Sequence, residues 1–167
     1  MAGRITASED QLRADPRHNS ILVAKFINCL MYDGKKSVAQ RVMYDALDDI
    51  DGRLKNLPAE QQEGAPESAV ACFEMAIENV KPHLEVRSKR IGGANYQVPM
   101  QVSPKRRQSL AFRWVLQATR AEKGRQMSKR LADEIFAAAR KEGKAMQTRE
   151  QTHRMAEANK AFAHFAF

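Results

Sequence analysis

The sequence predicts a mainly α-helical protein, a single-domain bundle of about six helices with one protruding two-stranded antiparallel β-hairpin between the third and fourth helices. The chain has 167 residues, 43% of them hydrophobic, which suffices for one domain around one core. Apolar residues recur at helical spacing in six separate segments. Between the third and the fourth segment the spacing changes to strand-like alternation around a Gly-Gly pair, which predicts the hairpin at about residues 84–102.

The N-terminal region has two parts. Residues 1–19 lack apolar periodicity and carry balanced charges, so we expect a mobile arm ahead of a helical domain at residues 20–167. Asn19 or Ser20 is the candidate cap of the first helix, which should end at Asp33-Gly34. Its apolar stripe is expected to face the core and consists of Leu22, Phe26, Cys29 and Leu30, with Val23, Ile27 and Met31 beside them.

A second and a third helix should flank a polar loop. Ser37 is the predicted cap of the second helix, which should end near Asp51-Gly52. The loop at residues 56–67 contains two prolines and a glycine and has no apolar pattern. Pro82 should stop the third helix. The core stripes expected here are Val38, Val42, Ala46, Leu47 and Ile50 in the second helix and Val70, Phe73, Ala76, Ile77 and Val80 in the third.

Three further helices are expected after the hairpin. Ser103-Pro104 places a cap before a proline at the first helical position, a typical helix start. A fifth helix should follow Gly124 and end at Gly143, and a sixth should begin at about Arg149. Their core residues are predicted to be Leu110, Ala111, Trp114, Val115 and Ala118, then Met127, Leu131, Ile135 and Ala138, then Met155, Ala158, Phe162 and Phe165.

The faces of the hairpin follow from the alternation of side chains along a strand. We expect the apolar positions of the two strands to share one face, which requires an odd number of loop residues within 92–95, where Gly and Asn tolerate positive φ. That face would carry Leu84 and Val86 with Tyr96, Val98 and Met100. The other face would place Arg87 and Lys89 opposite Gln97 and Gln101.

The positive charge is concentrated in the middle of the chain. The net charge is −4 over residues 1–80, +11 over residues 81–130 and +1 over residues 131–167. Charge spread for solubility would not cluster in this way, whereas a surface that neutralises phosphates would, because each bound cation releases a condensed counterion. The sequence therefore favours a nucleic acid as the partner over a solvated basic face or a membrane surface.

The fourth helix begins with cations, which the helix macrodipole disfavours by about 0.3–1 kcal/mol each. An anion is therefore expected at this end, and the base of the hairpin should continue the same surface. We predict one cationic concavity built from the hairpin and the helix start. A hairpin lying flat on the bundle is the alternative. The cations of the helix are Lys105, Arg106, Arg107 and Arg113.

Catalytic and metal sites are not indicated by any pattern in the sequence. The segment DGKKS is similar to part of a phosphate-binding loop, but such a loop requires Gly at the position of Cys29 and Ser or Thr at the position of Lys36. Lys35 and Lys36 are therefore interpreted as phosphate contacts at a helix junction. No histidines have zinc spacing, and Cys29 and Cys72 are predicted to be buried thiols. We expect no enzyme activity, cofactor or metal, no membrane span or signal segment, and a cytosolic location.

Two classes of nucleic-acid partner remain open at this point. An RNA-binding structural protein would recognise phosphates and the shape of irregular junctions. An architectural DNA-binding protein would use the β-ribbon as an arm, with Pro99 as a wedge between base steps. An enzyme acting on RNA is a weaker third alternative, since no acid and base pair converges.

Four separated blocks carry a resemblance: DGKKSVAQRVMYDAL, ENVKPHLEVRSKRIGGANYQVP, SPKRRQSLAFRW and REQTHRMAEANKAFAH. In this order they closely resemble the family of the bacterial seventh protein of the small ribosomal subunit, over roughly residues 20–165 apart from the 52–66 loop. The resemblance implies a helical bundle with a protruding hairpin. It also implies a primary rRNA-binding protein that nucleates assembly of the head and lies near the tRNA exit site.

The resemblance implies specific contacts and partners. The partners would be the 3′ major domain of 16S rRNA, exit-site tRNA at the hairpin tip, Gly92 and Gly93, and the ninth and eleventh small-subunit proteins. The location would be the cytoplasm, within the small ribosomal subunit. The residues that would bind rRNA are Lys25, Lys35, Lys36, Arg87, Lys89, Arg90, Lys105, Arg106, Arg107 and Arg113.

Overall fold

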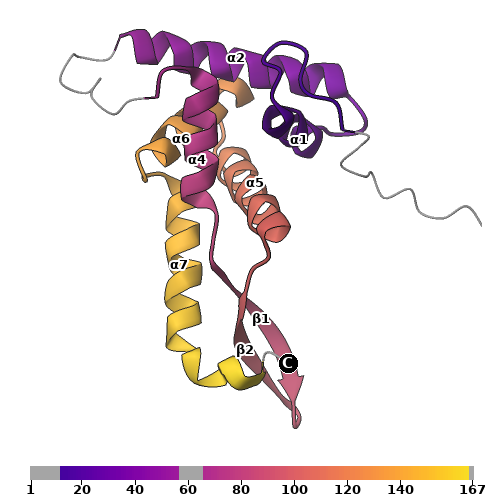
Figure 1. The fold of residues 1–167 in the computed structure, drawn as a ribbon, viewed down its shortest axis with the longest axis vertical. Helices are drawn as coiled ribbons and strands as arrows, with labels where there is room; N and C mark the ends of the chain where they lie inside the picture. The colour runs from indigo at the N-terminus through magenta and orange to yellow at the C-terminus, as the bar shows by residue number, and fades with distance from the viewer. Residues whose placement is uncertain (1–11, 57–65, 166–167) are drawn as a thin grey trace, which may run out of the picture.

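The computed structural model describes residues 12–56 and 66–165. It confirms a mainly helical fold with one antiparallel hairpin between the third and fourth described helices (Figure 1). Parts of the predicted arm and of the 52–66 loop lie outside the described residues, namely 1–11 and 57–65. The elements are α1 (Ile21–Leu30), α2 (Lys36–Lys55), α4 (Ala69–Val80), β1 (Leu84–Ile91), β2 (Ala94–Gln101), α5 (Pro104–Ala121), α6 (Met127–Ala139), α7 (Lys144–Ala158) and the 3₁₀ helix η2 (Lys160–Phe165).

The molecule is elongated, with the bundle at one end and the hairpin at the other (Figure 1). Helix α2 lies across the top of the bundle beside α1, and α4, α5 and α6 lie below it. The hairpin extends beyond the ends of α4 and α5, and α7 runs down alongside it. Helix η2 then turns beneath α7 toward the strands, which it contacts through β2. The hairpin therefore protrudes from the bundle but has a helical support on one side.

The core joins helices that are distant in sequence. Phe26 of α1 is fully buried, and its ring centroid lies 5.1 Å from that of Phe73 in α4 and 5.3 Å from that of Phe112 in α5. Both pairs are edge-to-face, the geometry that the aromatic quadrupole favours. Leu131 and Ile135 of α6 are also fully buried in this cluster. The predicted helical periods thus identified most of the core.

The helix starts agree with the predicted caps except at α2. The Ser20 side chain accepts a hydrogen bond from the Val23 N–H, so Ser20 is the cap of α1. Ser103 is the N-cap of α5, with proline following it. Helix α2 begins at Lys36 rather than after a Ser37 cap, because a tight turn at residues 32–34 already brings the chain into the helix. It also continues to Lys55, beyond the end predicted at Asp51-Gly52.

In α1 and α2, two positions predicted to be buried are exposed. Cys29 is exposed because the buried face of α1 follows Val23, Phe26, Ile27 and Leu30. Val38 is 54% exposed, since the buried face of α2 starts at Ala39, one residue later. The period was correct in both helices, but the stripe is rotated by about one residue. Cys72, by contrast, is buried as predicted, and burial raises its pKa to about 11.

The junction of α6 and α7 differs from the prediction. Lys141, with φ of 64°, takes the left-handed position after α6 that Gly143 was expected to provide. Gly143 is instead the N-cap of α7, and the buried Glu134 carboxylate accepts a 2.7 Å hydrogen bond from the Ala145 N–H. A side chain at residue 143 would clash with this carboxylate. Gly143 has no capping side chain, and Glu134 of α6 accepts the hydrogen bond in its place. Helix α7 therefore starts at Lys144, five residues before the predicted Arg149.

The end of the chain does not pack into the bundle as predicted. Met155 and Ala158 are exposed, because α7 leaves the bundle after its first turn and follows the hairpin. Phe162 and Phe165 pack instead on Tyr96 of β2, with ring centroids 5.1 Å and 5.7 Å from the tyrosine ring. Phe162 and Phe165 were predicted to face the core of the bundle, but the hairpin is their partner.

The predicted register of the hairpin is wrong. The strands pair from Leu84↔Gln101 to Ile91↔Ala94, which leaves a two-residue loop rather than an odd one. Gly92 and Gly93 both have positive φ, 56° and 89°, as the tight turns of two-residue hairpins require. The turn therefore sets the register, at the expense of matching apolar residues across the strands. As a result Arg87 lies opposite Val98, and Lys89 lies opposite Tyr96, rather than opposite glutamines.

Candidate nucleic-acid interface

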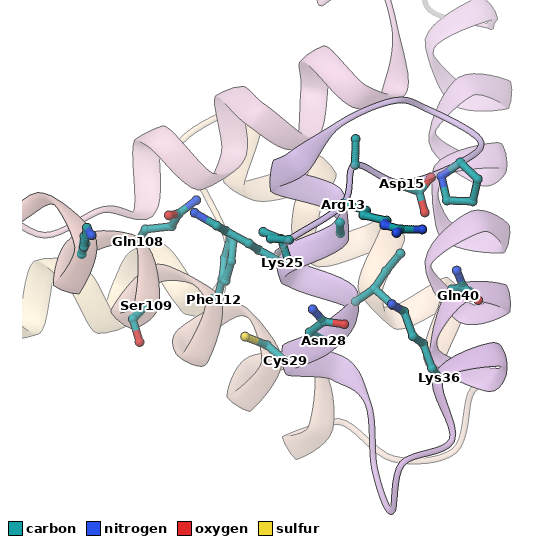
Figure 2. Close-up of a pocket in the computed structure, with 16 residues that line it drawn as sticks. Arg13, Asp15, Lys25, Asn28, Cys29, Lys36, Gln40, Gln108, Ser109 and Phe112 are labelled. Carbon is teal, nitrogen blue, oxygen red and sulfur yellow. The ribbon is translucent and has the colours of Figure 1, made fainter. Parts of the chain in front are cut away.

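A cleft of about 800 Å³ opens between α1, α2, α5 and the segment that precedes α1 (Figure 2). Four cations line it: Arg13 from that segment, Lys25 from α1, Lys36 from α2 and Lys105 from α5. Three of them were predicted as RNA contacts, and they come from positions up to 80 residues apart in the sequence. The cleft therefore concentrates positive charge at a concave site through tertiary folding.

Helical spacing explains why each helix contributes to the same cleft. Positions three, four and seven residues apart share one face of an α-helix. On α5 this face holds Lys105, Gln108, Ser109 and Phe112. Equivalent spacing on α1 gives Lys25, Asn28 and Cys29, and on α2 it gives Lys36 and Gln40.

Asp15 fixes the segment that forms the far wall of the cleft. Its carboxylate is 3% exposed and accepts hydrogen bonds from the Arg17 and His18 backbone N–H groups, each at 3.2 Å. It also accepts a 2.6 Å bond from the hydroxyl of Tyr44 on α2. Burial, and then this bond to Asp15, raise the pKa of Tyr44 to about 12. Residues 12–19 therefore include a hydrogen-bonded turn attached to α2.

Two helices present uncompensated N-termini beside these cations. Helix α2 begins at Lys35 and Lys36, and α5 begins with three cations after Ser103; neither first turn has an acidic residue. Neither N-cap side chain makes a capping hydrogen bond. Free backbone N–H groups and the positive end of the macrodipole favour an anion at such ends. A phosphate would supply such an anion, which supports phosphate binding at both helix starts.

At the base of the hairpin one acidic residue organises the cations. Glu85 is 8% exposed, and its carboxylate forms an ion pair with Arg87 on its own strand and another, at 3.1 Å, with the Arg106 Nε of α5. The Arg107 Nε donates a 3.0 Å bond to the Val102 carbonyl. The hairpin and the helix start therefore adjoin, as predicted. Some of these cations are nevertheless already bonded to protein groups, and these contacts attach the hairpin to the bundle.

Nearer the tip, the remaining residues predicted to contact RNA are exposed. The Lys89 Nζ donates a 2.9 Å bond to the Phe165 carbonyl of η2, and Arg90 is exposed two positions before the turn. Gly92 and Gly93 form the exposed tip. Proline 99, in contrast, is buried, so it is not presented as a wedge for base steps.

The predicted site residues are thus distributed over two surfaces and not one. Lys25, Lys36 and Lys105 line the cleft, whereas Lys35 lies in a separate groove and Arg113 is exposed farther along α5. Sequence reasoning missed the partners that shape these surfaces. On α5, the helical spacing from Lys105 was a usable signal for Gln108. No sequence signal marked the other missed residues. The missed residues are Arg13, Asn28, Gln40, Glu85 and Gln108.

Metal-ligand clusters and membrane-spanning helices are absent from residues 12–56 and 66–165. Within these ranges no three His, Cys, Asp or Glu side chains gather as metal ligands would. None of the described helices is both long and apolar enough to cross a bilayer. Cys29 lines the cleft, but burial raises the pKa of its thiol. A raised pKa keeps a thiol protonated and less nucleophilic.

Comparison with known proteins gives a consistent result. A family model described as ribosomal protein S7p/S5e matches residues 2–160. A small ribosomal subunit protein uS7 from Rhodopirellula baltica is 60% identical over 165 residues, which cover 99% of each chain. A protein of the same name from Thermotoga neapolitana is 49% identical over 162 residues, covering 97% of each chain. A uS7A/uS7B protein from Bartonella bacilliformis is 46% identical over 165 residues.

Proposed function

Because the chain belongs to the ribosomal protein S7p/S5e family, we propose that it binds the rRNA of the small subunit through both the cleft and the hairpin. The chain is a structural constituent of the small ribosomal subunit, and it acts in translation in the cytoplasm without being an enzyme.

The convergence of cations on the cleft is the observation that carries the proposal. Lys25, Lys36 and Lys105 come from three helices, and the starts of two of these helices also offer free backbone N–H groups. Such a site suits the closely spaced phosphates of a folded RNA strand. In this proposal Arg106, Arg107 and Arg113 of α5 extend the contact beyond the cleft, as does Lys35.

The hairpin would provide a second contact. Arg87, Lys89 and Arg90 would bind rRNA phosphates along the strands, and the tip at Gly92 and Gly93 would approach exit-site tRNA. The exposed two-glycine turn supports this proposal, since its small size allows a close approach of backbone to a ligand.

The finer role in assembly is part of the same proposal. The protein would be a primary binder of the 3′ major domain of 16S rRNA and would nucleate assembly of the head. The ninth and eleventh small-subunit proteins would be its neighbours. A DNA-bending ribbon finds no support in the hairpin, since its proline is buried between the strands and the helical support.

Salt dependence of RNA binding tests the proposal. With about six phosphate contacts, affinity for a 3′ major domain fragment should fall roughly a thousandfold between 50 and 200 mM salt. Fluorescence anisotropy against labelled RNA measures this slope. A competition with duplex DNA of equal phosphate number is the control. A flat salt response, or preference for the DNA, would contradict the proposal.

A further inference from the structure

We infer that the cleft holds an unpaired nucleotide of the RNA and reads the edge of its base, with Asn28 and Gln108 as the reading residues. The inference rests on the proposed binding of rRNA and specifies what enters the cleft. Cations alone would fit any phosphate backbone. The lining of the cleft also contains a second set of groups, which are not needed for binding an RNA phosphate backbone.

These groups are side-chain amides. Asn28, Gln40 and Gln108 all line the cleft, one from each helix, and within the described residues none of the three makes a side-chain hydrogen bond. An amide offers donors and an acceptor, whereas a phosphate only accepts. The acceptor halves of these side chains therefore suit the mixed donor and acceptor edge of a base.

The arrangement of charges and amides fits one nucleotide and its flanking phosphates. Figure 2 shows Lys25 extending toward Gln108 at one end of the cleft, with Arg13 and Lys36 gathered toward the other end. Asn28 lies between these two groups of cations (Figure 2). A strand that crosses the cleft would thus meet a cation on each side of the central amide.

A fully paired double helix would not present a base to the cleft. An A-form duplex presents a wide, shallow minor groove and a deep major groove that side chains do not read, so its bases stay stacked inside. A concave space of about 800 Å³ falls in the range of about 300–1,000 Å³ that encloses small ligands. Part of its lining is apolar, from Ala24, Ile27 and Phe112, which suits the faces of an unstacked base.

The test compares two RNA stems with equal numbers of phosphates, one fully paired and one with a short unpaired bulge. Wild-type protein should bind the bulged stem more tightly, and the Asn28→Ala/Gln108→Ala variant should lose roughly five- to tenfold in affinity for that stem alone. Four bulge sequences would identify the preferred base. Gln117→Ala is the matched control, because Gln117 is an exposed amide on α5 outside the cleft.

The outcomes separate the inference from the proposed function. If wild type binds both stems equally, or if the double variant keeps the preference for the bulge, the cleft does not read a base. An equal loss on both stems would also contradict base reading and would mean that the amides support phosphate binding. Lys25→Ala should weaken both stems. If it weakens neither, RNA binding through the cleft is itself wrong. Helical circular dichroism verifies that each variant is folded.

Discussion

The cleft and the hairpin both present cations, but they are built in different ways. The cleft gathers single residues from four segments onto a concave surface that is backed by the core. The hairpin carries its cations in one run of β1, and two of them already have protein partners, Glu85 for Arg87 and the Phe165 carbonyl for Lys89.

This difference indicates that charge density in the sequence is not a direct measure of binding strength. The run at residues 87–90 is the more conspicuous in the sequence, yet part of its charge stabilises the position of the hairpin. A cation that is already paired releases less free energy when it meets a phosphate, since its own ion pair is weakened or lost. The cleft should contribute more to RNA affinity than the hairpin does, because its concave surface also places the N-termini of α2 and α5 beside its cations.

Removing three cations from each surface should produce the largest effect. A Lys25→Ala/Lys36→Ala/Lys105→Ala variant should lose about three phosphate contacts, or roughly 500-fold in affinity at 0.1 M salt for a slope of about 0.9 per contact. The matched Arg87→Ala/Lys89→Ala/Arg90→Ala variant should lose only one or two, roughly 10- to 60-fold. Salt titrations of affinity for the same rRNA fragment measure both.

Two outcomes would contradict this comparison. Equal losses for the two triple variants would mean that the partners of Arg87 and Lys89 do not reduce their contribution. A larger loss for the hairpin variant would reverse the order of the two surfaces. The unfolding midpoint of each variant, measured in urea, separates a binding defect from a folding defect.

How much the sequence could predict also differs between the two regions. The hairpin, its glycine tip and its cations follow from local alternation and turn chemistry, although the register did not. The two-residue turn sets the register, so that Tyr96 lies opposite Lys89 and finds its apolar partner outside the hairpin. Phe162 and Phe165, about 70 residues away in the sequence, supply that partner. No local pattern reports such a contact.

The cleft illustrates the opposite limit. Helices α1, α2 and α5 were predicted close to their observed positions, and Lys25, Lys36 and Lys105 were predicted to contact RNA. Their convergence was not predictable, because it depends on how α1 packs against α2 and α5. A rotation of about one residue in the apolar stripe of α1 also turned Cys29 from the core toward the cleft.

Asp15 offers a way to weaken the cleft without removing a cation. Asp15→Asn should destabilise the fold by about 2 kcal/mol, because a buried carboxylate that accepts several hydrogen bonds is replaced by a weaker acceptor. RNA affinity should fall by less than in the cleft triple variant, since Arg13 alone would be displaced. Urea denaturation measures the first effect, and anisotropy measures the second.

Asp45→Asn is the matched control for this variant, because Asp45 is exposed on the same helix as Tyr44. It should leave stability nearly unchanged. If Asp15→Asn is equally silent, the segment at residues 12–19 does not depend on this carboxylate for its position.

The hairpin should respond to pH through His153, with the smallest effect of the series. Burial, followed by Arg149 and His83, lowers the pKa of His153, and its Nε2 accepts a 3.2 Å hydrogen bond from the His83 N–H at the entry to β1. Glu157 and Lys160 line the same groove. Protonation of His153 would remove the acceptor and place a positive charge beside Arg149.

The sign follows from comparing the folded and unfolded chains. Because the pKa of His153 is lowered in the folded chain, the unfolded chain binds the proton more readily. The stability that His153 contributes is therefore fully present above about pH 6.5, the ordinary histidine pKa, and is lost as the pH falls below that value. A loss of at most about 1 kcal/mol is expected for one neutral hydrogen bond.

His153→Gln should flatten this pH dependence of stability in urea unfolding between neutral and mildly acid pH, while His164→Gln, at an exposed position, should not. Hydrogen exchange of the β1 amides should locate the loss at the base of the hairpin. Uniform loss of protection in α1 and α2 as well would mean that His153 does not act through the hairpin, and that the two regions unfold as one unit.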